Sequence, residues 1–210
     1  MKYDVIIIGS GLGGLECAHI LSKAGKRVLV LEKEAQPGGC VQSYRRNGLT
    51  FDTGFHYVGG LEEGQSLHAA FSMLGLMALP WKKLDDAFDR ILIGEEEFSF
   101  TQGYESFREN LQLYFPHEQE ALQQYVQLLK QTEQTQLELL NPESASAPLA
   151  LFETGAWQYL TQTFHNSMLV NVLSATSLKM ELRKETLPFF TFLNVKATYI
   201  ESRCRLKGPV

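Results

Sequence analysis

The sequence has few cysteines, and none of them are spaced as a pair. The three, Cys17, Cys40 and Cys204, are odd in number, lie far apart and form no C-x-x-C motif. This favours a reduced, intracellular setting over a disulfide framework. The histidines likewise show no metal-ligand spacing, so no metal site is predicted.

The chain also lacks a long basic run and a long apolar run. Its net charge is −5, which argues against nucleic acid as a partner because phosphate binding needs clustered Lys and Arg. No apolar stretch approaches the roughly 18 residues of a transmembrane helix. The apolar run Val5–Ile8 is short and follows Asp4, so we interpret the N-terminus as a mature cytoplasmic start rather than a signal peptide.

The first part of the sequence alternates strand, helix and strand. The apolar runs Tyr3–Ile8 and Arg27–Leu31 are predicted to be buried parallel strands. Between them, Leu12–Ala24 has helical spacing, and Gly25 follows as a helix-ending residue. Three such elements within about 30 residues predict a βαβ unit.

The remainder is mainly helical. Residues 36–60 are rich in glycine and are expected to be loop with short strand pieces. Two strands are expected at 88–93 and 97–101, joined by a turn at Gly94. Other expected segments are helices at 65–76, 104–114 and 117–140, a connector at 141–148, and a mainly helical region at 149–200. The fold class is therefore α/β, with a helix-rich insertion after about residue 60.

The turn between the first strand and the first helix carries a phosphate-binding motif. It reads Gly9-Ser10-Gly11-Leu12-Gly13-Gly14 and matches G-x-G-x-x-G. Gly9 makes the tight turn, Gly11 lets the backbone approach a pyrophosphate, and Gly14 lets the helix pack closely. The free N–H groups and the positive dipole end of the helix then face the phosphates.

Glu32 ends the second strand, about 20 residues after this motif. At that position a carboxylate accepts a hydrogen bond from a ribose hydroxyl, and it repels a 2′-phosphate, so NADP is disfavoured. The competing interpretation is a solvated charge at a strand end. NAD and FAD both fit the pattern up to this point.

The next segment separates the two cofactors through a family resemblance. The glycine pair Gly38-Gly39, followed by the Asp52-Thr53-Gly54 turn, resembles the FAD-dependent superfamily of amine oxidases and phytoene desaturases. Amine oxidases commonly carry Arg after the glycine pair. The Gly-Gly-Cys form here, with Phe51–Tyr57, is more similar to the carotenoid isomerase and retinol saturase branch. The resemblance covers residues 3–60 and returns weakly at 199–208.

This resemblance implies FAD as the cofactor and a set of contacting residues. Those are Gly9, Ser10, Gly11, Leu12, Gly13, Gly14, Glu32, Lys33, Gly38, Gly39, Gly54 and His56. It also implies an FAD-binding domain that begins at 1–60, a helix-rich substrate region with a short β-hairpin at 61–195, and a return to the first domain at 196–210. The FAD-binding core of Rossmann type is therefore expected to be incomplete.

Several residues keep two interpretations. His56 either contacts flavin or substrate or is a structural turn residue. Cys40 is either a reactive thiol or, the favoured alternative, a small buried residue beside the backbone. The Arg45-Arg46 pair either meets a pyrophosphate or a substrate acid or is solvated. The aromatic residues of 149–192 either line a substrate tunnel or, the favoured alternative, form a helical core; they are Phe152, Trp157, Phe164, Phe189, Phe190 and Phe192. No residue is assigned as catalytic acid or base.

The predicted function is an FAD-dependent oxidoreductase that desaturates, saturates or isomerises an apolar polyene. The alternatives are an amine-oxidising flavoenzyme, or a non-catalytic nucleotide-binding remnant or partner subunit. Relatives run to about twice this length, so the chain is expected to be an N-terminal half that is inactive alone. Three further interactions stay open: self-association, pairing with a complementary C-terminal half, and peripheral contact with a membrane.

Overall fold

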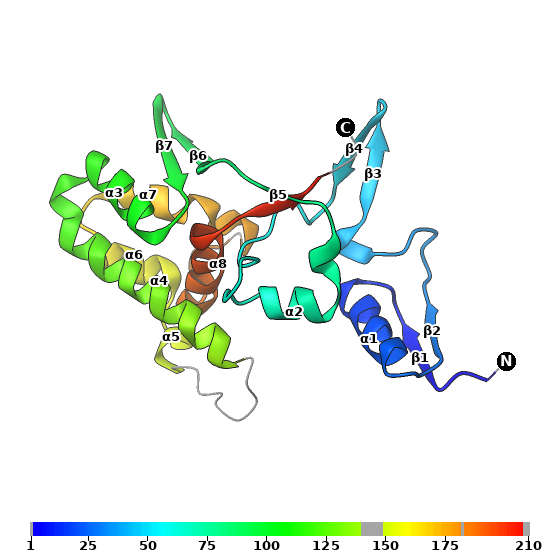
Figure 1. Cartoon of the computed structure of the whole chain (residues 1–210). Helices are drawn as coiled ribbons and strands as arrows, with labels where there is room; N and C mark the ends of the chain where they lie inside the picture. The colour runs from blue at the N-terminus through cyan, green and yellow to red at the C-terminus, as the bar shows by residue number, and fades with distance from the viewer. Residues whose placement is uncertain (1, 140–148, 182, 208–210) are drawn as a thin grey trace. The chain divides into compact units, whose positions relative to one another are not determined.

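The computed structural model describes residues 2–139, 149–181 and 183–207, so the predicted connector at 141–148 lies outside the described residues. The chain forms two compact units. The first comprises Met1–Val58, Ala69–Lys82 and Arg205–Val210, and the second comprises Gly59–His68 and Lys83–Cys204. Figure 1 labels the helices and strands of both.

The elements of the first part of the chain are short. They are β1 (Val5–Ile8), α1 (Leu12–Lys23), β2 (Val28–Leu31), η1 (Gly39–Val41), β3 (Ser43–Arg46), β4 (Leu49–Asp52), α2 (His68–Met73), η2 (Leu76–Ala78), β5 (Trp81–Lys83) and, near the C-terminus, β8 (Cys204–Leu206).

The predicted βαβ unit is confirmed. β1 and β2 pair in parallel, from Val5 opposite Val28 to Ile8 opposite Leu31, and α1 connects them. The helix ends as the glycine predicts. The N–H of Gly25, at a φ of 78°, donates to Ser22 O, and the N–H of Lys26 donates to Leu21 O. This pair of bonds is a Schellman motif, in which a glycine with positive φ satisfies the last helical carbonyls.

The prediction that these two strands are buried is wrong. Ile6 is 59% exposed and Ile8 is 88% exposed. A parallel strand is buried on both faces only when helices cover both faces of its sheet. This sheet has two strands, and α1 is the helix that packs against them within the unit.

Two further strand pairs belong to this part of the chain. β3 and β4 form an antiparallel hairpin that turns at Asn47 and Gly48, which have φ values of 51° and 79°. Two consecutive residues with positive φ match the twist of a two-residue hairpin. β5 and β8 pair with each other, and neither was predicted. The helix expected at 65–76 is shorter, because α2 ends before Gly75, whose φ is 74°.

The second unit is a helical assembly against one hairpin. Its elements are β6 (Ala87–Ile93), β7 (Glu96–Thr101), α3 (Tyr104–Tyr114), η3 (Pro116–Glu118), α4 (Gln119–Leu139), α5 (Leu149–Glu153), α6 (Ala156–Thr163), α7 (Ser167–Ser174), η4 (Ala175–Lys179) and α8 (Phe189–Glu201). The antiparallel β6–β7 pair, with its turn at Gly94, is confirmed. The predicted helix at 104–114 and the mainly helical character of 149–200 are confirmed as well.

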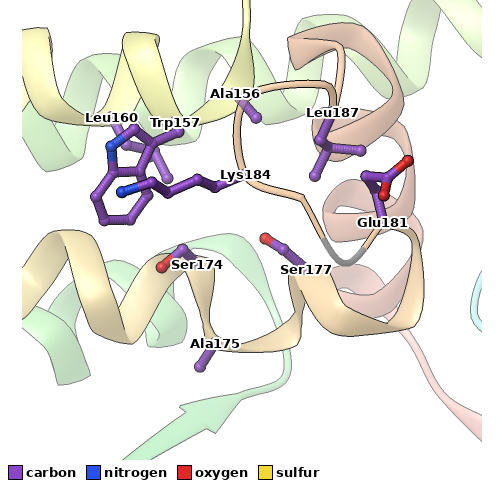
Figure 2. A pocket seen from close by; sticks show the side chains of 9 residues that line it. All are labelled: Ala156, Trp157, Leu160, Ser174, Ala175, Ser177, Glu181, Lys184 and Leu187. Carbon is purple, nitrogen blue, oxygen red and sulfur yellow. The ribbon is translucent and has the colours of Figure 1, made fainter.

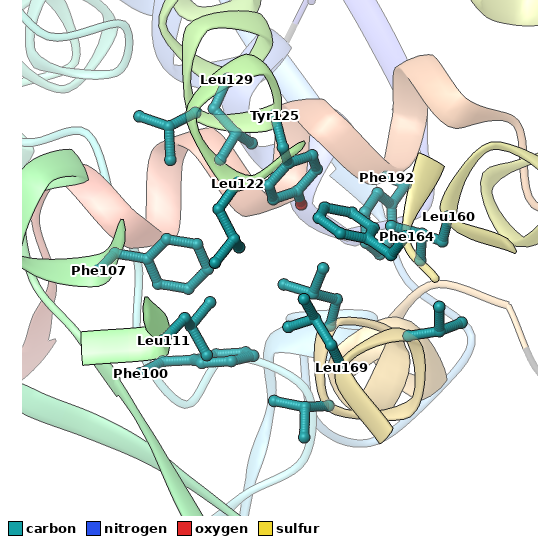
Figure 3. Packing of buried hydrophobic residues seen from close by; sticks show 14 of the residues in the cluster. Phe100, Phe107, Leu111, Leu122, Tyr125, Leu129, Leu160, Phe164, Leu169 and Phe192 are labelled. Atoms are coloured by element: carbon teal, nitrogen blue, oxygen red, sulfur yellow. The ribbon is translucent and has the colours of Figure 1, made fainter. Parts of the chain in front are cut away.

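A continuous apolar core fills this unit, as Figure 3 shows. Phe107 and Leu111 of α3 and Leu122 of α4 are fully buried. The core interpretation of the aromatic residues holds for four of the six: Phe164, Phe189, Phe190 and Phe192 are buried. Phe152 is 44% exposed and packs against Phe190 in a tilted arrangement, with ring centroids 4.3 Å apart. Trp157 is half-buried.

The charged side chain of Lys196 lies inside this core. Lys196 of α8 is 3% exposed, and its Nζ lies 4.4 Å from the centroid of the Phe100 ring and 5.5 Å from that of Phe192. Among the described residues, Nζ has no hydrogen-bond partner. Burial lowers the pKa of Lys196 from 10.5 to about 7, against a smaller upward effect of Asp89.

Replacing this lysine should stabilise the second unit. Lys196→Met keeps an apolar stem and removes the buried charge, so we expect a gain of about 2–4 kcal/mol in unfolding free energy at pH 7. The folded pKa is the lower one, so the cost of the charge is greatest below pH 7 and vanishes as pH rises toward 10.5. The gain should therefore shrink between pH 7 and 9.5 in urea unfolding followed by circular dichroism.

The matched control is Lys82→Met, because Lys82 is exposed and its replacement should change stability little at either pH. An equal gain from Lys196→Met at both pH values would show that the buried lysine does not titrate in this range.

Candidate functional site

In the turn formed by the glycine motif, Gly9 and Gly14 need to be glycine for two different geometric reasons. Gly9 has a φ of 99°, and its N–H donates to Leu31 O at 2.7 Å, which ties the turn to the end of β2. A Cβ on Gly14 would lie 2.1 Å from Gly9 O. A side chain at either position is therefore excluded, by backbone conformation at Gly9 and by contact at Gly14.

Gly11 leaves open space. It is the N-cap of α1, and a Cβ built on it meets nothing within 4 Å. No side chain caps this end of the helix, and no acidic residue lies in its first turn. The first N–H groups of α1 and the positive end of its dipole therefore remain free for an anion.

Glu32 is held by hydrogen bonds from two directions. Its Oε2 accepts from the N–H of Ser10 at 2.8 Å and from the Ser10 hydroxyl at 2.5 Å. Its Oε1 accepts from the N–H of Glu34 at 3.0 Å. These donors, the Ser10 hydroxyl foremost, lower the pKa of the Glu32 carboxyl to about 2. Glu32 therefore carries its negative charge at any physiological pH.

The second glycine pair lies beside the first motif. The N–H of Gly38 donates to Ser10 O at 2.9 Å, and Gly38 has a φ of 115°. A Cβ on Gly39 would lie 3.1 Å from the Cα of Gly11. Gly11 and Gly38 are 27 residues apart in the sequence. Their two segments nevertheless approach so closely that their backbones are in contact, and a side chain on Gly39 would disturb this contact.

The D-x-G turn packs on the same loop. A Cβ on Gly54 would lie 2.6 Å from Cys40 O, and the Thr53 hydroxyl donates to that carbonyl at 3.2 Å. The favoured interpretation of Cys40 as a buried residue is wrong, because its side chain is exposed. It is the Cys40 carbonyl, rather than the thiol, that packs against the turn.

The structure thus brings together most of the predicted site. Gly9, Ser10, Gly11, Gly14, Glu32, Gly38 and Gly39 form one connected group, and Gly54 joins it through Cys40. Leu12, Gly13, Lys33 and His56 are exposed beside it. Lys33 pairs with Glu34 at 3.5 Å and points its charge to solvent. Arg45 and Arg46 are exposed on β3.

The sequence pattern did not reveal the part that Ser10 plays. A variable position of G-x-G-x-x-G carries no prediction by itself, yet Ser10 is 2% exposed and bonds to both Glu32 and Gly38. The available signal was the residue type, because a serine hydroxyl can donate to the carboxylate that the motif places nearby.

A separate cavity lies in the second unit. It measures about 250 Å³ (Figure 2), and its lining residues are Ala156, Trp157, Leu160, Ser174, Ala175, Ser177, Glu181, Lys184 and Leu187. Lys184 Nζ lies 4.5 Å from the Trp157 ring centroid at its edge. Typical ligand pockets measure about 300–1,000 Å³, so this cavity is small for a polyene and we assign no substrate to it.

Comparison with known proteins identifies relatives of this chain. Residues 7–74 match the NAD(P)-binding Rossmann-like domain family. The chain is 41% identical to all-trans-retinol 13,14-reductase of Homo sapiens over 133 residues, which are 61% of this chain and 22% of that protein. It is 31% identical to the Danio rerio enzyme of the same name over 188 residues, 86% of this chain and 31% of that protein.

A second group of relatives comes from plants. Prolycopene isomerase 2 of an Oncidium hybrid cultivar is 34% identical over 126 residues, 59% of this chain and 22% of that protein. The chain therefore spans less than a third of the length of these relatives. Among the described helices, none has the length and apolar character needed to cross a membrane.

Comparison with solved structures identifies proteins of similar fold. Cyclohexylamine oxidase from Brevibacterium oxydans superimposes with a TM-score of 0.61 at 18% identity, over 92% of this chain and 41% of that one. Putrescine oxidase gives a TM-score of 0.60 at 18% identity, over the same two shares. At such low identity these likenesses concern the fold alone. Residues 7–74 are thus similar to the NAD(P)-binding Rossmann-like domain family, the chain is similar in sequence to retinol 13,14-reductases and prolycopene isomerases, and its fold is similar to part of two amine oxidases.

Proposed function

We propose that this chain binds the ADP half of FAD and belongs to a flavin-dependent oxidoreductase that acts on an apolar polyene. The observation that supports this proposal is that three features lie close together. They are the uncapped N-terminus of α1 at Gly11, the charged Glu32, and the second glycine pair. The open space at Gly11 suits a pyrophosphate, and the carboxylate suits a ribose hydroxyl.

The second glycine pair favours FAD over NAD. A long cofactor that lies along the backbone needs positions without side chains, and Gly38 and Gly39 supply such positions next to Gly11. When bound, FAD would supply the electron transfer; residues of this chain would hold its phosphates and its adenosine ribose. We assign no acid or base to this chain.

The substrate class rests on the names of the relatives. Retinol and prolycopene are both apolar polyenes, and the proteins named for them are 31–41% identical to this chain. Amine oxidation is the weaker alternative, because the amine oxidases are similar in fold at 18% identity. A non-catalytic role is the other alternative, since an inactive all-trans-retinol 13,14-reductase of Danio rerio is 33% identical over 131 residues.

Gly11→Ala should weaken FAD binding at least tenfold while leaving the fold intact. The added methyl group occupies the space that the pyrophosphate needs, yet it meets no atom of the free chain within 4 Å. FAD titration by calorimetry measures the affinity, and thermal unfolding checks the fold.

The matched control is Ser22→Ala, near the other end of the same helix and outside the candidate site. Ser22 is exposed, and alanine favours the helix in which it lies. We expect FAD affinity close to wild type. Equal affinity of the Gly11 variant and wild type would contradict the assignment of the pyrophosphate site.

Glu32→Gln should weaken FAD binding by about fivefold to tenfold, because hydrogen bonds to a charged acceptor are stronger than those to a neutral one. Glu34→Gln is the control: it makes the same change on an exposed neighbour whose backbone N–H, rather than its side chain, contacts Glu32. If both variants bind FAD equally well, Glu32 is a solvated strand-end charge.

A further inference from the structure

Ser10 bonds to two residues, Glu32 and Gly38, that lie 22 and 28 residues away in the sequence. Its N–H and its hydroxyl donate to Glu32 at the end of β2, and its carbonyl accepts from the N–H of Gly38. The same Gly38 N–H also approaches the Ser10 hydroxyl oxygen at 3.4 Å. Ser10 itself is 2% exposed, whereas Glu32 is half-buried, so the bonds between them are partly shielded from competing water.

We propose that the Ser10 hydroxyl is a positioning group that orients the Glu32 carboxylate toward one ribose hydroxyl and thereby sets the preference of the site for a 2′-hydroxyl over a 2′-phosphate. This inference rests on the proposed function, because it assumes that the adenosine ribose meets Glu32. It adds a second residue, acting through Glu32, to the determinants of nucleotide choice.

The hydrogen-bond arrangement explains how a single hydroxyl has this effect. A carboxylate offers about four acceptor positions. Ser10 takes two at Oε2 and the N–H of Glu34 takes one at Oε1. The backbone N–H of Lys33 makes a weaker contribution to the same carboxylate, so the remaining acceptor capacity suits at most a single further donor. A ribose hydroxyl supplies that donor, whereas a 2′-phosphate presents no donor at neutral pH and adds a like charge.

The hydroxyl also keeps Glu32 charged. It is the largest of the influences that lower the pKa of this carboxyl to about 2. Without the hydroxyl, the backbone N–H donors to Glu32 remain, but Oε2 loses one of its two hydrogen bonds. The side chain can then turn toward solvent, and its pKa rises toward the ordinary value of 4.5.

A double-mutant cycle tests whether Ser10 acts through Glu32. The affinities of wild type, Ser10→Ala, Glu32→Gln and the double variant are measured by calorimetry with ADP-ribose and with 2′-phospho-ADP-ribose. Ser10→Ala should weaken ADP-ribose binding by about threefold to tenfold. It should also reduce the ratio by which the chain prefers ADP-ribose to 2′-phospho-ADP-ribose. In the Glu32→Gln background, the same serine change should have no further effect, because residues in one hydrogen-bond network are not additive.

The pH dependence of ADP-ribose binding distinguishes this role from a purely structural one. A purely structural role of Ser10 would leave that pH dependence unchanged. The ratio of the ADP-ribose dissociation constants of Ser10→Ala and wild type should grow between pH 7 and pH 4, by up to about fourfold if the carboxyl returns to its ordinary pKa. Titration of the probe itself is common to both chains and cancels in this ratio.

Each result decides between distinct conclusions. Additive effects in the cycle, an unchanged preference in Ser10→Ala, or a ratio independent of pH would overturn the role of Ser10 while leaving the proposed function intact. Failure of the wild-type chain to bind ADP-ribose would instead contradict the proposed function. If Ser10→Ala does not fold, Ser10→Cys replaces it, since a thiol has similar size but donates weakly and should give the same shifts.

Discussion

The candidate site depends on the hydrogen bonds that converge on Ser10. A strand end, a glycine turn and a loop with positive φ meet at this one buried residue. Each segment alone would lose conformational entropy to hold a ligand in place, at about 1–2 kcal/mol per ordered residue. Because Ser10 bonds to both Glu32 and Gly38, the strand end, the glycine turn and the loop are held relative to one another in the free chain, which would lower the entropic cost of binding a ligand there.

The two units are stabilised by different means. The second has an apolar core in which Phe107 and Leu122 are fully buried, so apolar burial dominates its stability. In the first unit, α1 has no buried residue and Ile8 of β1 is 88% exposed. Its site is held by backbone and side-chain hydrogen bonds at Ser10, which contribute about 1 kcal/mol each. The geometry of the nucleotide site is therefore more sensitive to single polar substitutions than the helical core is.

Features encoded locally were predictable from the sequence, and those set by distant contacts were not. The glycine turn, α1 and its end at Gly25 follow from neighbouring residues, as does the β6–β7 hairpin. The turn at Asn47-Gly48 was also encoded, since that dipeptide is a strong hairpin signal, but the segment was interpreted as mostly loop. By contrast, β5 is three residues long and pairs with β8, over a hundred residues away. So short a strand has no periodicity to detect. The exposure of Ile8 likewise depends on which elements cover the sheet, not on the residue itself.

Two lowered pKa values show how the same physics gives opposite results in the two units. Donors around Glu32 stabilise its charged form, so its low pKa means that the charge persists. Burial of Lys196 among aromatic rings destabilises its charged form, so its low pKa means that the charge is readily lost near neutral pH. A charge that persists at the rim of an open glycine turn can act in ligand recognition, whereas one that is lost inside a packed core cannot. Electrostatics therefore favours Glu32, rather than Lys196, as a charged group available for ligand recognition.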